Sequence, residues 1–408
     1  MSGKKRRNLL QHFGFFSISR EKAVGKKIIW LQAVSVGEIA TAEPVIRELK
    51  NLIDEFAFVV SVTTEAGYRR AQKVFPDALE IFYTPFDFYP AISSLMKKVR
   101  PAAILIIETG FWPNLIYCGK KFGAVSVLVN GRISEKSFRN HKSIGFFARP
   151  LFSMFDLVMA RDAAVSGRFK ELGVDEGKII SLGDIKYDTL RMAGQAEMET
   201  YKKVFSIGPG EKVIMAGNTH EGEEEFMLDV FDELRRGIEN LLLIIAPRRL
   251  ERVPHIEKIL REKGKSYVKR SALERQARGS EDVILLDTIG ELAAVYFICD
   301  AIFVGKSIFP PGGGHSLLEP VAAGKAPFHG PYVQYYEEAR AALKEAGLSV
   351  ELKDKAEFAG HFREVLEDDD KREELAKRAG SFLKGRRGAS KKAAEAVALE
   401  IRRARYLH

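Results

Sequence analysis

A glutamate stands at a predicted strand-to-helix corner near the start of the chain. The stretch LQAVSVGEIATAEP, residues 31–44, is mostly apolar up to Val36, turns at Gly37 and continues after Glu38 with apolar residues at helical spacing. Ligands of α/β proteins collect at such corners, so Glu38 is a candidate general base. A carboxylate in the first helical turn is also an ordinary feature, because it faces the positive end of the helix dipole. This stretch by itself favours the ordinary helix start.

A second candidate site is the glycine-rich segment FVGKSIFPPGGGHSLLEPVAAGKAPFHGP, residues 303–331. A strand is predicted to end at Gly305, and a helix is predicted to begin near Ser316 with Glu319 in its first turn. Backbone amides at a helix start can bind phosphate, and a carboxylate one turn later can accept hydrogen bonds from ribose hydroxyls. The glycine run favours nucleotide binding over the alternative, a capping box formed by Ser316 and Glu319.

Further combinations of glycine and polar residues follow predicted strands in both halves of the chain. None is specific alone, because strand-to-helix turns need glycine and capping residues in any case. Their recurrence at the same end of the strands predicts that they line the floor of one cleft. These combinations are Glu108-Thr109-Gly110, Asn130-Gly131-Arg132, Gly183-Asp184-Ile185-Lys186, Gly217-Asn218-Thr219-His220 and Pro247-Arg248-Arg249.

Metal-binding and other catalytic motifs are not evident. His220 and His315 have no second ligand at a helical spacing, and the acidic run EDDDK at 367–371 is more typical of a solvated helix boundary than of a metal site. The sequence has no Walker A loop, no GxGxxG after a strand and no Gly-x-Ser-x-Gly. We therefore expect neither a metal nor an organic cofactor.

Short apolar runs alternate with amphipathic stretches, which is the pattern of βαβ units and parallel sheets. A polar segment at 191–211 interrupts the pattern and is interpreted as a linker. It separates predicted domains at 1–190 and 212–367, and a charged, alanine-rich helical tail follows at 368–408. The sequence thus predicts an α/β protein with two Rossmann-like, doubly wound domains facing a central cleft. The predicted strands are 28–33, 56–62, 79–84, 102–108, 124–130, 156–160, 178–183, 212–217, 241–247, 282–287, 300–305 and 326–330.

Composition limits the classes of partner and compartment. The chain has 408 residues, 46% of them hydrophobic, a net charge of +9 and two cysteines. No apolar run approaches the roughly 18 residues that a spanning helix needs, no signal peptide is recognisable, and the sparse cysteines are typical of a reducing compartment. The positive charge favours acidic partners, and no pattern typical of nucleic-acid binding is present. Eight basic residues and three phenylalanines within residues 1–27 are compatible with a solvated tail or with an anchor on an anionic membrane.

Eight sequence blocks, in order along almost the whole chain, resemble the 3-deoxy-D-manno-octulosonic acid (Kdo) transferases of lipopolysaccharide synthesis. So many blocks in a fixed order make the resemblance specific. The blocks are AVSVGEIATAEPVIREL, ETGFWPNLI, NGRISEKSF, GDIKYD, AGNTHEGEEE, APRRLERV, DTIGELAAVYFICDAIFVGKS and GGGHSLLEPVAAGKAPFHGP.

The resemblance implies a GT-B fold and an inverting glycosyltransferase that moves Kdo from CMP-Kdo to a lipid A precursor, lipid IVA. It implies that residues 1–190 bind the acceptor and that residues 212–367 bind the nucleotide sugar. The implied location is the cytoplasmic face of the inner membrane, where the chain is peripheral and contacts an anionic surface. A non-catalytic nucleotide-sugar or lipid-binding protein and a sugar-nucleotide epimerase of the same fold are the alternatives.

The resemblance also implies roles for individual residues. Glu38 is the implied general base, kept ionised by its helix start, and Glu108 and Lys186 are the implied transition-state residues. The chain departs from the family at Gly110, where glutamate is usual, and at Ser316, where asparagine is common. The implied CMP-binding residues are Pro247, Arg248, Ile289, Gly290, Glu291, Ser316, Leu317, Leu318 and Glu319.

Overall fold

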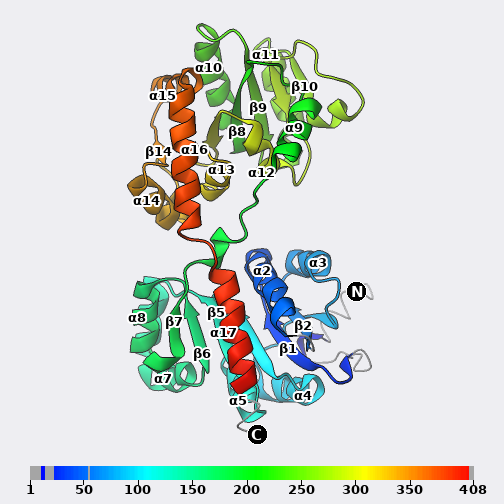
Figure 1. The fold of residues 1–408 in the computed structure, drawn as a ribbon, viewed down its shortest axis with the longest axis vertical. Coiled ribbons are helices and arrows are strands. Elements are labelled where there is room, and N and C mark those ends of the chain that lie inside the picture. The colour runs from blue at the N-terminus through cyan, green and yellow to red at the C-terminus, as the bar shows by residue number, and fades with distance from the viewer. Residues whose placement is uncertain (1–10, 14–22, 54–55, 404–408) are drawn as a thin grey trace. The chain divides into compact units, whose positions relative to one another are not determined.

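The chain folds into two compact units, each built on its own parallel sheet (Figure 1). The computed structural model describes residues 11–13, 23–53 and 56–403. Unit 1 comprises residues 1–189 together with 386–408, and unit 2 comprises residues 190–385. The predicted α/β class, with the two Rossmann-like units of a GT-B protein, is confirmed.

The sheet of unit 1 has seven parallel strands in the order β3-β2-β1-β4-β5-β6-β7. The chain reverses its direction of travel across the sheet between β1 and β4, which is where doubly wound sheets open a crevice for ligands. The strands are β1 Lys27–Gln32, β2 Phe56–Val62, β3 Glu80–Tyr83, β4 Ala103–Ile107, β5 Val125–Gly131, β6 Leu157–Ala160 and β7 Ile179–Ser181.

Helices cover both faces of this sheet, and its strands are apolar on both sides for that reason. One core lies between the sheet and α2, α3 and α17, and the other lies on the opposite face. The helices are α2 Val36–Leu52, α3 Glu65–Val74, α4 Tyr89–Val99, α5 Pro113–Lys121, α6 Glu135–Ser143, α7 Gly145–Ser153, α8 Ala163–Glu171, α17 Ala389–Arg403 and the short turns η2 Glu176–Lys178 and η3 Ile185–Tyr187.

The sheet of unit 2 repeats the plan with the order β10-β11-β9-β8-β12-β13-β14 and places its reversal between β8 and β12. Its strands are β8 Lys212–Thr219, β9 Leu241–Pro247, β10 Tyr267–Lys269, β11 Val283–Leu285, β12 Ala301–Val304, β13 Pro327–His329 and β14 Val350–Glu351. The longer helices are α9 Gln195–Val204, α10 Glu223–Arg235, α11 Val253–Glu262, α14 Glu337–Glu345, α15 Lys355–Glu367 and α16 Asp369–Lys384. The short ones are η4 Leu250–Arg252, η5 Arg270–Glu274, α12 Leu292–Val295, η6 Tyr296–Ile298, α13 Leu318–Ala322 and η7 Gln334–Tyr336.

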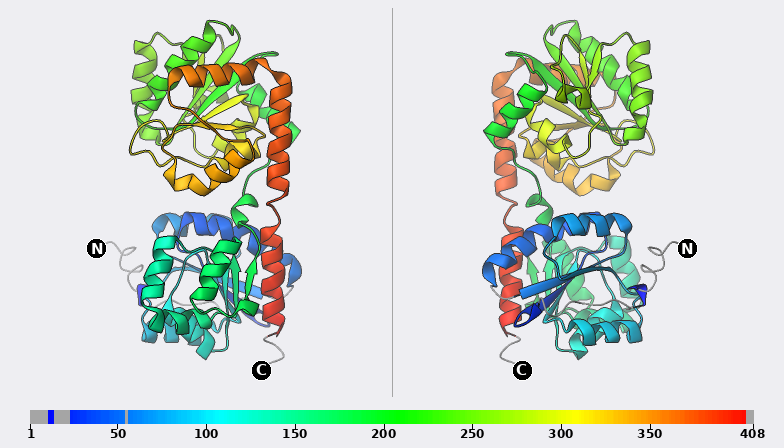
Figure 2. Two further views of the ribbon diagram at one scale, coloured as in Figure 1. Left: turned by 90° about the vertical axis from the view of Figure 1, so that its left-hand side faces the viewer. Right: turned by 90° about the vertical axis from the view of Figure 1, so that its right-hand side faces the viewer.

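The C-terminal helices differ from the single tail expected at 368–408. Helix α16 belongs to unit 2, whereas α17 belongs to unit 1, where it lies along α2 (Figures 1 and 2). The Asp188 carboxylate accepts hydrogen bonds from the backbone of Gly388 and Ser390, both at 2.7 Å, and so fixes the start of α17. The segment 191–211, expected to be a linker, contains α9 and lies within unit 2.

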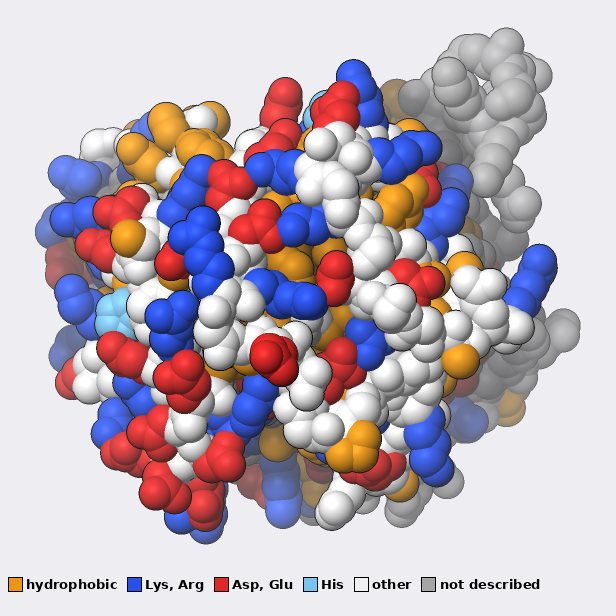
Figure 3. All heavy atoms as spheres, turned by 90° about the horizontal axis from the view of Figure 1, so that it is seen from above, with side chains coloured by type: hydrophobic (Ala, Val, Ile, Leu, Met, Phe, Trp, Pro, Cys, Tyr) orange, Lys and Arg blue, Asp and Glu red, His pale blue; other side chains and the backbone are white. Residues whose placement is uncertain are grey.

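The hydropathy of the helices and the distribution of surface charge limit how the protein can contact membranes and nucleic acids. Within the described part of the chain, no helix is long and apolar enough to cross a membrane. On the face drawn in Figure 3, Lys and Arg side chains are interspersed with Asp and Glu side chains rather than gathered in one basic patch. That face therefore lacks the continuous basic surface typical of nucleic-acid binding.

Candidate functional site

Glu38 lies at the start of α2, just beyond the end of β1. Its backbone amide donates to the Ser35 hydroxyl at 3.2 Å, and its carboxylate accepts a hydrogen bond from the Val34 amide at 2.7 Å. This arrangement resembles a capping box, except that the carboxylate accepts from the residue before the N-cap, so Glu38 does have a role as a helix-start residue. The capping bond uses Oε2, and Oε1 makes no hydrogen bond among the described residues.

Burial also changes the acidity of Glu38. The side chain is only 6% exposed. Desolvation raises its pKa from the ordinary 4.5 to about 7, and the neighbouring Glu108 adds to the rise; the Val34 hydrogen bond, Arg132 and Lys186 oppose it. The helix start was expected to keep this carboxylate ionised, but with a pKa of about 7 it is only partly ionised at neutral pH, because burial disfavours the charged form. A pKa near neutrality suits a group that accepts a proton at physiological pH.

Glu108 follows β4, the strand next to β1, and is 3% exposed. Its φ of +58° is uncommon for a residue with a side chain, and such conformations cluster at functional sites. One carboxylate oxygen lies 2.9 Å from Arg132 Nε. The other accepts a hydrogen bond from the Thr41 hydroxyl at 2.9 Å and lies 3.7 Å from Lys186 Nζ. Glu108 thus holds two cations beside Glu38.

The position of Lys186 depends on a bond between separate strand ends. Asn130, at φ +54° near the end of β5, donates from its amide to Asp184 at 3.0 Å and accepts from the Ile185 backbone at 3.0 Å. Asp184 in turn accepts from the Lys186 backbone at 2.9 Å. These contacts bring the turn after β7 to the side chain of Glu108. The structure therefore brings Glu38, Glu108 and Lys186 together.

Arg132 and Thr41 complete this cluster, and neither was assigned a role from the sequence. Arg132 stands in the strand-end combination Asn130-Gly131-Arg132, so the signal for it was present. Thr41 lies one turn after Glu38 on α2, and nothing in its local sequence indicates that it binds a carboxylate. Gly110 lies nearby in sequence, and an added Cβ would approach Ile106 at 2.9 Å and Trp112 at 3.0 Å. The packing here therefore fits the glycine and not the glutamate that the resemblance led us to expect.

In unit 2, Arg248 and Glu319 form the centre of the expected nucleotide site. Arg248 follows Pro247 at the end of β9, and its backbone amide donates to the Thr219 carbonyl at 3.1 Å. Glu319 is largely withdrawn from solvent, and desolvation raises its pKa while the charge of Arg248 opposes the rise. Tyr336 is close enough to both for their charges to affect its own pKa. The charge of Arg248 thus reaches Glu319, although no hydrogen bond or ion pair joins the two among the described residues, and their binding of CMP stays a prediction.

The helix that carries Glu319 is short. Helix α13 spans only Leu318–Ala322, with Leu317 at the N-cap position and no side-chain capping bond. The alternative interpretation of Ser316 and Glu319 as a capping box is therefore excluded. Leu317 is fully buried and fixes the loop. A helix of five residues also has a weak dipole, which weakens the case for phosphate binding at this helix start, and that binding stays a prediction.

Ile289, Gly290 and Glu291 lie in a separate cluster of unit 2. Glu291 accepts hydrogen bonds from Arg270, at 2.8 Å, and from the Thr288 hydroxyl, whereas Ile289 is 87% exposed. Among the described residues no hydrogen bond or ion pair links this cluster to Arg248 or Glu319. The assignment of these three residues to CMP stays a prediction.

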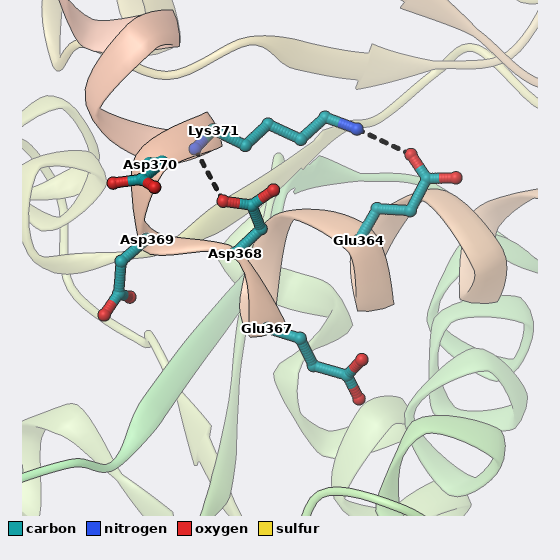
Figure 4. A pocket seen from close by; sticks show the side chains of 6 residues that line it. All are labelled: Glu364, Glu367, Asp368, Asp369, Asp370 and Lys371. Atoms are coloured by element: carbon teal, nitrogen blue, oxygen red, sulfur yellow. Dashed lines mark hydrogen bonds and ion pairs between the residues drawn. The ribbon is translucent and has the colours of Figure 1, made fainter.

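Acidic and histidine side chains are the potential metal ligands of this chain. In the described part of the chain, no group of three or more His, Cys, Asp or Glu side chains is arranged to hold a metal ion. The acidic segment forms an open pocket lined by residues 364 and 367–371, where α15 ends and α16 begins (Figure 4). Asp368 caps α16 through the Lys371 amide at 2.8 Å, and Lys371 Nζ lies 2.6 Å from Glu364. These contacts are those of a solvated helix boundary.

Comparison with known proteins shows which families this chain is similar to. Residues 7–189 match a family model described as 3-deoxy-D-manno-octulosonic-acid transferase (kdotransferase), and residues 199–382 match one described as glycosyl transferases group 1. The 3-deoxy-D-manno-octulosonic acid transferase of Haemophilus influenzae is 28% identical over 95% of this chain and 90% of that protein. A bifunctional glycosyltransferase/methyltransferase of Fusobacterium nucleatum is 30% identical over 86% of this chain, and the match spans only 54% of that protein.

Solved structures share the fold at low identity. The UDP-GlcNAc 2-epimerase of Neisseria meningitidis, bound to UDP-GlcNAc, is 15% identical with a TM-score of 0.60 over 92% of this chain and 99% of that chain. A glycosyltransferase from Rickettsia africae is 13% identical with a TM-score of 0.58. Because epimerases and transferases both appear, fold likeness does not separate them. The sequence matches do so: residues 7–189 belong to the 3-deoxy-D-manno-octulosonic acid transferase family, and residues 199–382 belong to the group 1 glycosyltransferases.

Proposed function

We propose that this protein is an inverting glycosyltransferase that moves Kdo from CMP-Kdo to a lipid A precursor, lipid IVA, in lipopolysaccharide synthesis. The observation that carries the proposal is the cluster at the strand ends of unit 1. There a buried carboxylate with a pKa of about 7, Glu38, adjoins Glu108 and two cations, Arg132 and Lys186. The names of the relatives indicate that the transferred sugar is Kdo. The cluster contains a base that is suited to a single-displacement reaction.

In this proposal Glu38 accepts the proton of the acceptor hydroxyl as that oxygen attacks the anomeric carbon of Kdo. Inversion follows because the phosphate of CMP leaves from the opposite face of the sugar. Glu108 keeps Arg132 and Lys186 in place, and the half-exposed Lys186 ammonium is available to the Kdo carboxylate or to developing charge. Unit 1 would bind the acceptor, and unit 2 would bind the nucleotide through Arg248 and Glu319.

The direct test is to incubate the purified protein with CMP-Kdo and lipid IVA and to measure the mass of the lipid product. Transfer adds one or more Kdo residues and releases CMP only when the acceptor is present. A sugar-nucleotide epimerase would change or release the donor without the acceptor. A binding protein without activity would bind CMP-Kdo and leave both substrates intact.

The proposed acceptor is a membrane lipid, so contact with an anionic membrane surface on the cytoplasmic face of the inner membrane belongs to the proposal. Most of the basic N-terminal segment expected to make this contact, residues 1–10 and 14–22, lies outside the described residues. A described surface of unit 1 supports the same role. Where α6 meets α7, Ile144, Phe146 and Phe147 are 55%, 86% and 75% exposed, and we call them the apolar corner. Residues 135–149 around it contain four Lys or Arg and one carboxylate.

Replacing Phe146 and Phe147 by serine together should weaken binding to vesicles that contain anionic lipid by about tenfold or more. Partial insertion of an aromatic ring stabilises the bound state by about 1 kcal/mol each, and both contributions would be lost. The measurement is co-sedimentation of the full chain with such vesicles over a range of salt. Leu399→Ser, which removes an exposed apolar side chain from α17, is the control. Equal binding of wild type and double variant would exclude the corner as the contact.

We expect transfer to continue in excess chelator. The proposed mechanism neutralises charge with Arg248, Arg132 and Lys186, which are protein cations, so it needs no divalent ion. The measurement is the initial transfer rate with and without EDTA, after dialysis against the chelator. A rate that vanishes in EDTA and returns with added Mg²⁺ would show that this expectation is wrong.

A further inference from the structure

Two histidines meet at the strand ends of unit 2. His220 follows β8, and His315 lies in the glycine-rich loop between β12 and α13. Their Nε2 atoms are 3.0 Å apart, and their ring centroids are 5.2 Å apart at an interplanar angle of 25°. A neutral imidazole nitrogen either donates or accepts, so this contact requires a hydrogen on one of the two facing atoms only. The pair therefore shares one hydrogen between the facing Nε2 atoms. Both rings cannot be imidazolium ions at the same time in this geometry, because both facing atoms would then carry a hydrogen.

Buried contacts hold this pair in place. The Glu223 carboxylate accepts from the backbone of His220 at 2.9 Å, Lys306 at 2.7 Å and Ser307 at 2.8 Å, and so ties the ends of β8 and β12 together. The glycines at 312–314 all have positive φ, and a Cβ at 313 would lie 2.4 Å from the ring of Tyr335. Only glycines fit the loop beside the Tyr335 ring, and this loop places His315 next to His220. The pair sits at the reversal point between β8 and β12.

The charged groups around the pair are mostly cations. Burial and the charges of Lys306, Arg249, Arg252 and Arg248 lower the pKa of His220. Burial, His220, Arg248 and Lys306 lower the pKa of His315 to about 4. The carboxylates nearby are engaged elsewhere: Glu223 binds backbone amides, and Glu224 binds Arg252 and the Thr219 hydroxyl. Without a ligand, the two rings are therefore neutral at pH 7 within a positive field.

We propose that the His220–His315 pair is part of the phosphate-binding site of unit 2 and takes up one proton when a nucleoside monophosphate binds. A phosphate dianion among Arg248 and Lys306 cancels the positive field that keeps the rings neutral. One ring can then become an imidazolium by taking a proton on the nitrogen that faces away from the other ring. That N–H donates a hydrogen bond to the phosphate, while the hydrogen between the two Nε2 atoms stays in place. The inference rests on the proposed function, because it places the donor's phosphate in unit 2.

The same proton would assist the proposed transfer. When the bond between the anomeric carbon of Kdo and the phosphate oxygen breaks, the electron pair stays on that oxygen, and the phosphate changes from a monoanion to a dianion. An imidazolium at the pair stabilises this added charge without giving up its proton. His220 and His315 are thus positioning and charge-balancing residues for the leaving group.

The test is calorimetric titration of CMP into the full chain at pH 7, repeated in buffers of different ionisation enthalpy. The slope of observed enthalpy against ionisation enthalpy gives the number of protons taken up. We expect the wild type to take up close to one proton more per CMP than His315→Asn or His220→Asn. His255→Asn, on an exposed residue of α11, should keep the wild-type number. Proton exchange by the phosphate itself is common to all four proteins and cancels in the comparison.

The affinity for CMP gives a second readout. Wild-type affinity should fall severalfold between pH 6.5 and pH 8, more steeply than in either asparagine variant. If both variants fail to fold, as judged by their melting curves, the wild-type titration alone tests the proposal. The slope of its observed enthalpy against buffer ionisation enthalpy must then show net uptake of a proton on CMP binding. Equal proton uptake in wild type and folded variants overturns this inference alone. Failure of the wild type to bind CMP overturns the proposed function and the inference with it.

Discussion

Replacing Glu38 by glutamine should lower the rate of Kdo transfer by about 10²–10⁴-fold, the contribution typical of a general base. Glutamine keeps the shape and the polarity of the side chain and cannot accept the acceptor's proton. CMP affinity should change little, because the proposed nucleotide site lies in unit 2. The measurement compares transfer rate and CMP affinity on one preparation. Glu48→Gln, a change on the same helix away from the cluster, is the matched control.

The pH dependence gives the same residue a second signature. Below its pKa of about 7 the wild-type base is protonated, so the rate should fall about tenfold per pH unit there and level off above it. A raised carboxyl pKa means that the folded state holds a proton which the unfolded state has already lost. Stability relative to Glu38→Gln should therefore decline as the pH rises from about 4.5 to about 7. A folded Glu38→Gln protein with near wild-type turnover would leave the residue with its capping role alone.

Removing Arg248 or Glu319 should weaken CMP binding by about 1–3 kcal/mol each, the cost of leaving a buried partner unsatisfied. The two side chains influence each other electrostatically within unit 2, so either loss disturbs the same site. Calorimetry of Arg248→Ala and Glu319→Ala with CMP measures the effect as roughly a 5- to 150-fold rise in Kd.

Exposed residues of the same unit supply the controls for this pair. Arg275→Ala and Glu345→Ala remove the same kinds of charge away from the site and should leave Kd unchanged. Glu319→Gln should retain more affinity than Glu319→Ala, because the amide can still accept one hydrogen bond. Unchanged Kd for both Arg248→Ala and Glu319→Ala would show that CMP does not bind at these residues.

Much of the fold was predictable because parallel strands buried on both faces are apolar runs, and such runs are visible in a sequence. The polar residues after those runs were visible too, including Glu108, Lys186 and Arg248. Their convergence was not visible, since it depends on strand order and on single contacts between distant segments. Lys186 follows β7, two strands away from β5, and reaches Glu108 only because Asn130 bonds to Asp184.

The departures from expectation have equally local causes. The motif Ser316-x-x-Glu319 has the spacing of a capping box, but the helix begins with Leu317 as its N-cap, so Pro320 occupies the position whose amide would be capped. For Glu38 the sequence showed that a helix start favours ionisation of the carboxylate. It did not show the burial of the side chain, which opposes ionisation. A tail rich in alanine and charge predicts helices, and no local pattern states which sheet each of them covers.

The return of α17 to unit 1 affects how the chain folds while it is being synthesised. Residues 1–189 emerge from the ribosome first, and N-terminal domains commonly fold as soon as they emerge. Here the apolar side chains of Ala393, Val397 and Ile401 are part of the core beside α2 and are made about two hundred residues later. Unit 2 can close its core before unit 1 does. The nascent chain should therefore expose the apolar side chains of α2 that α17 covers until synthesis of unit 2 is complete.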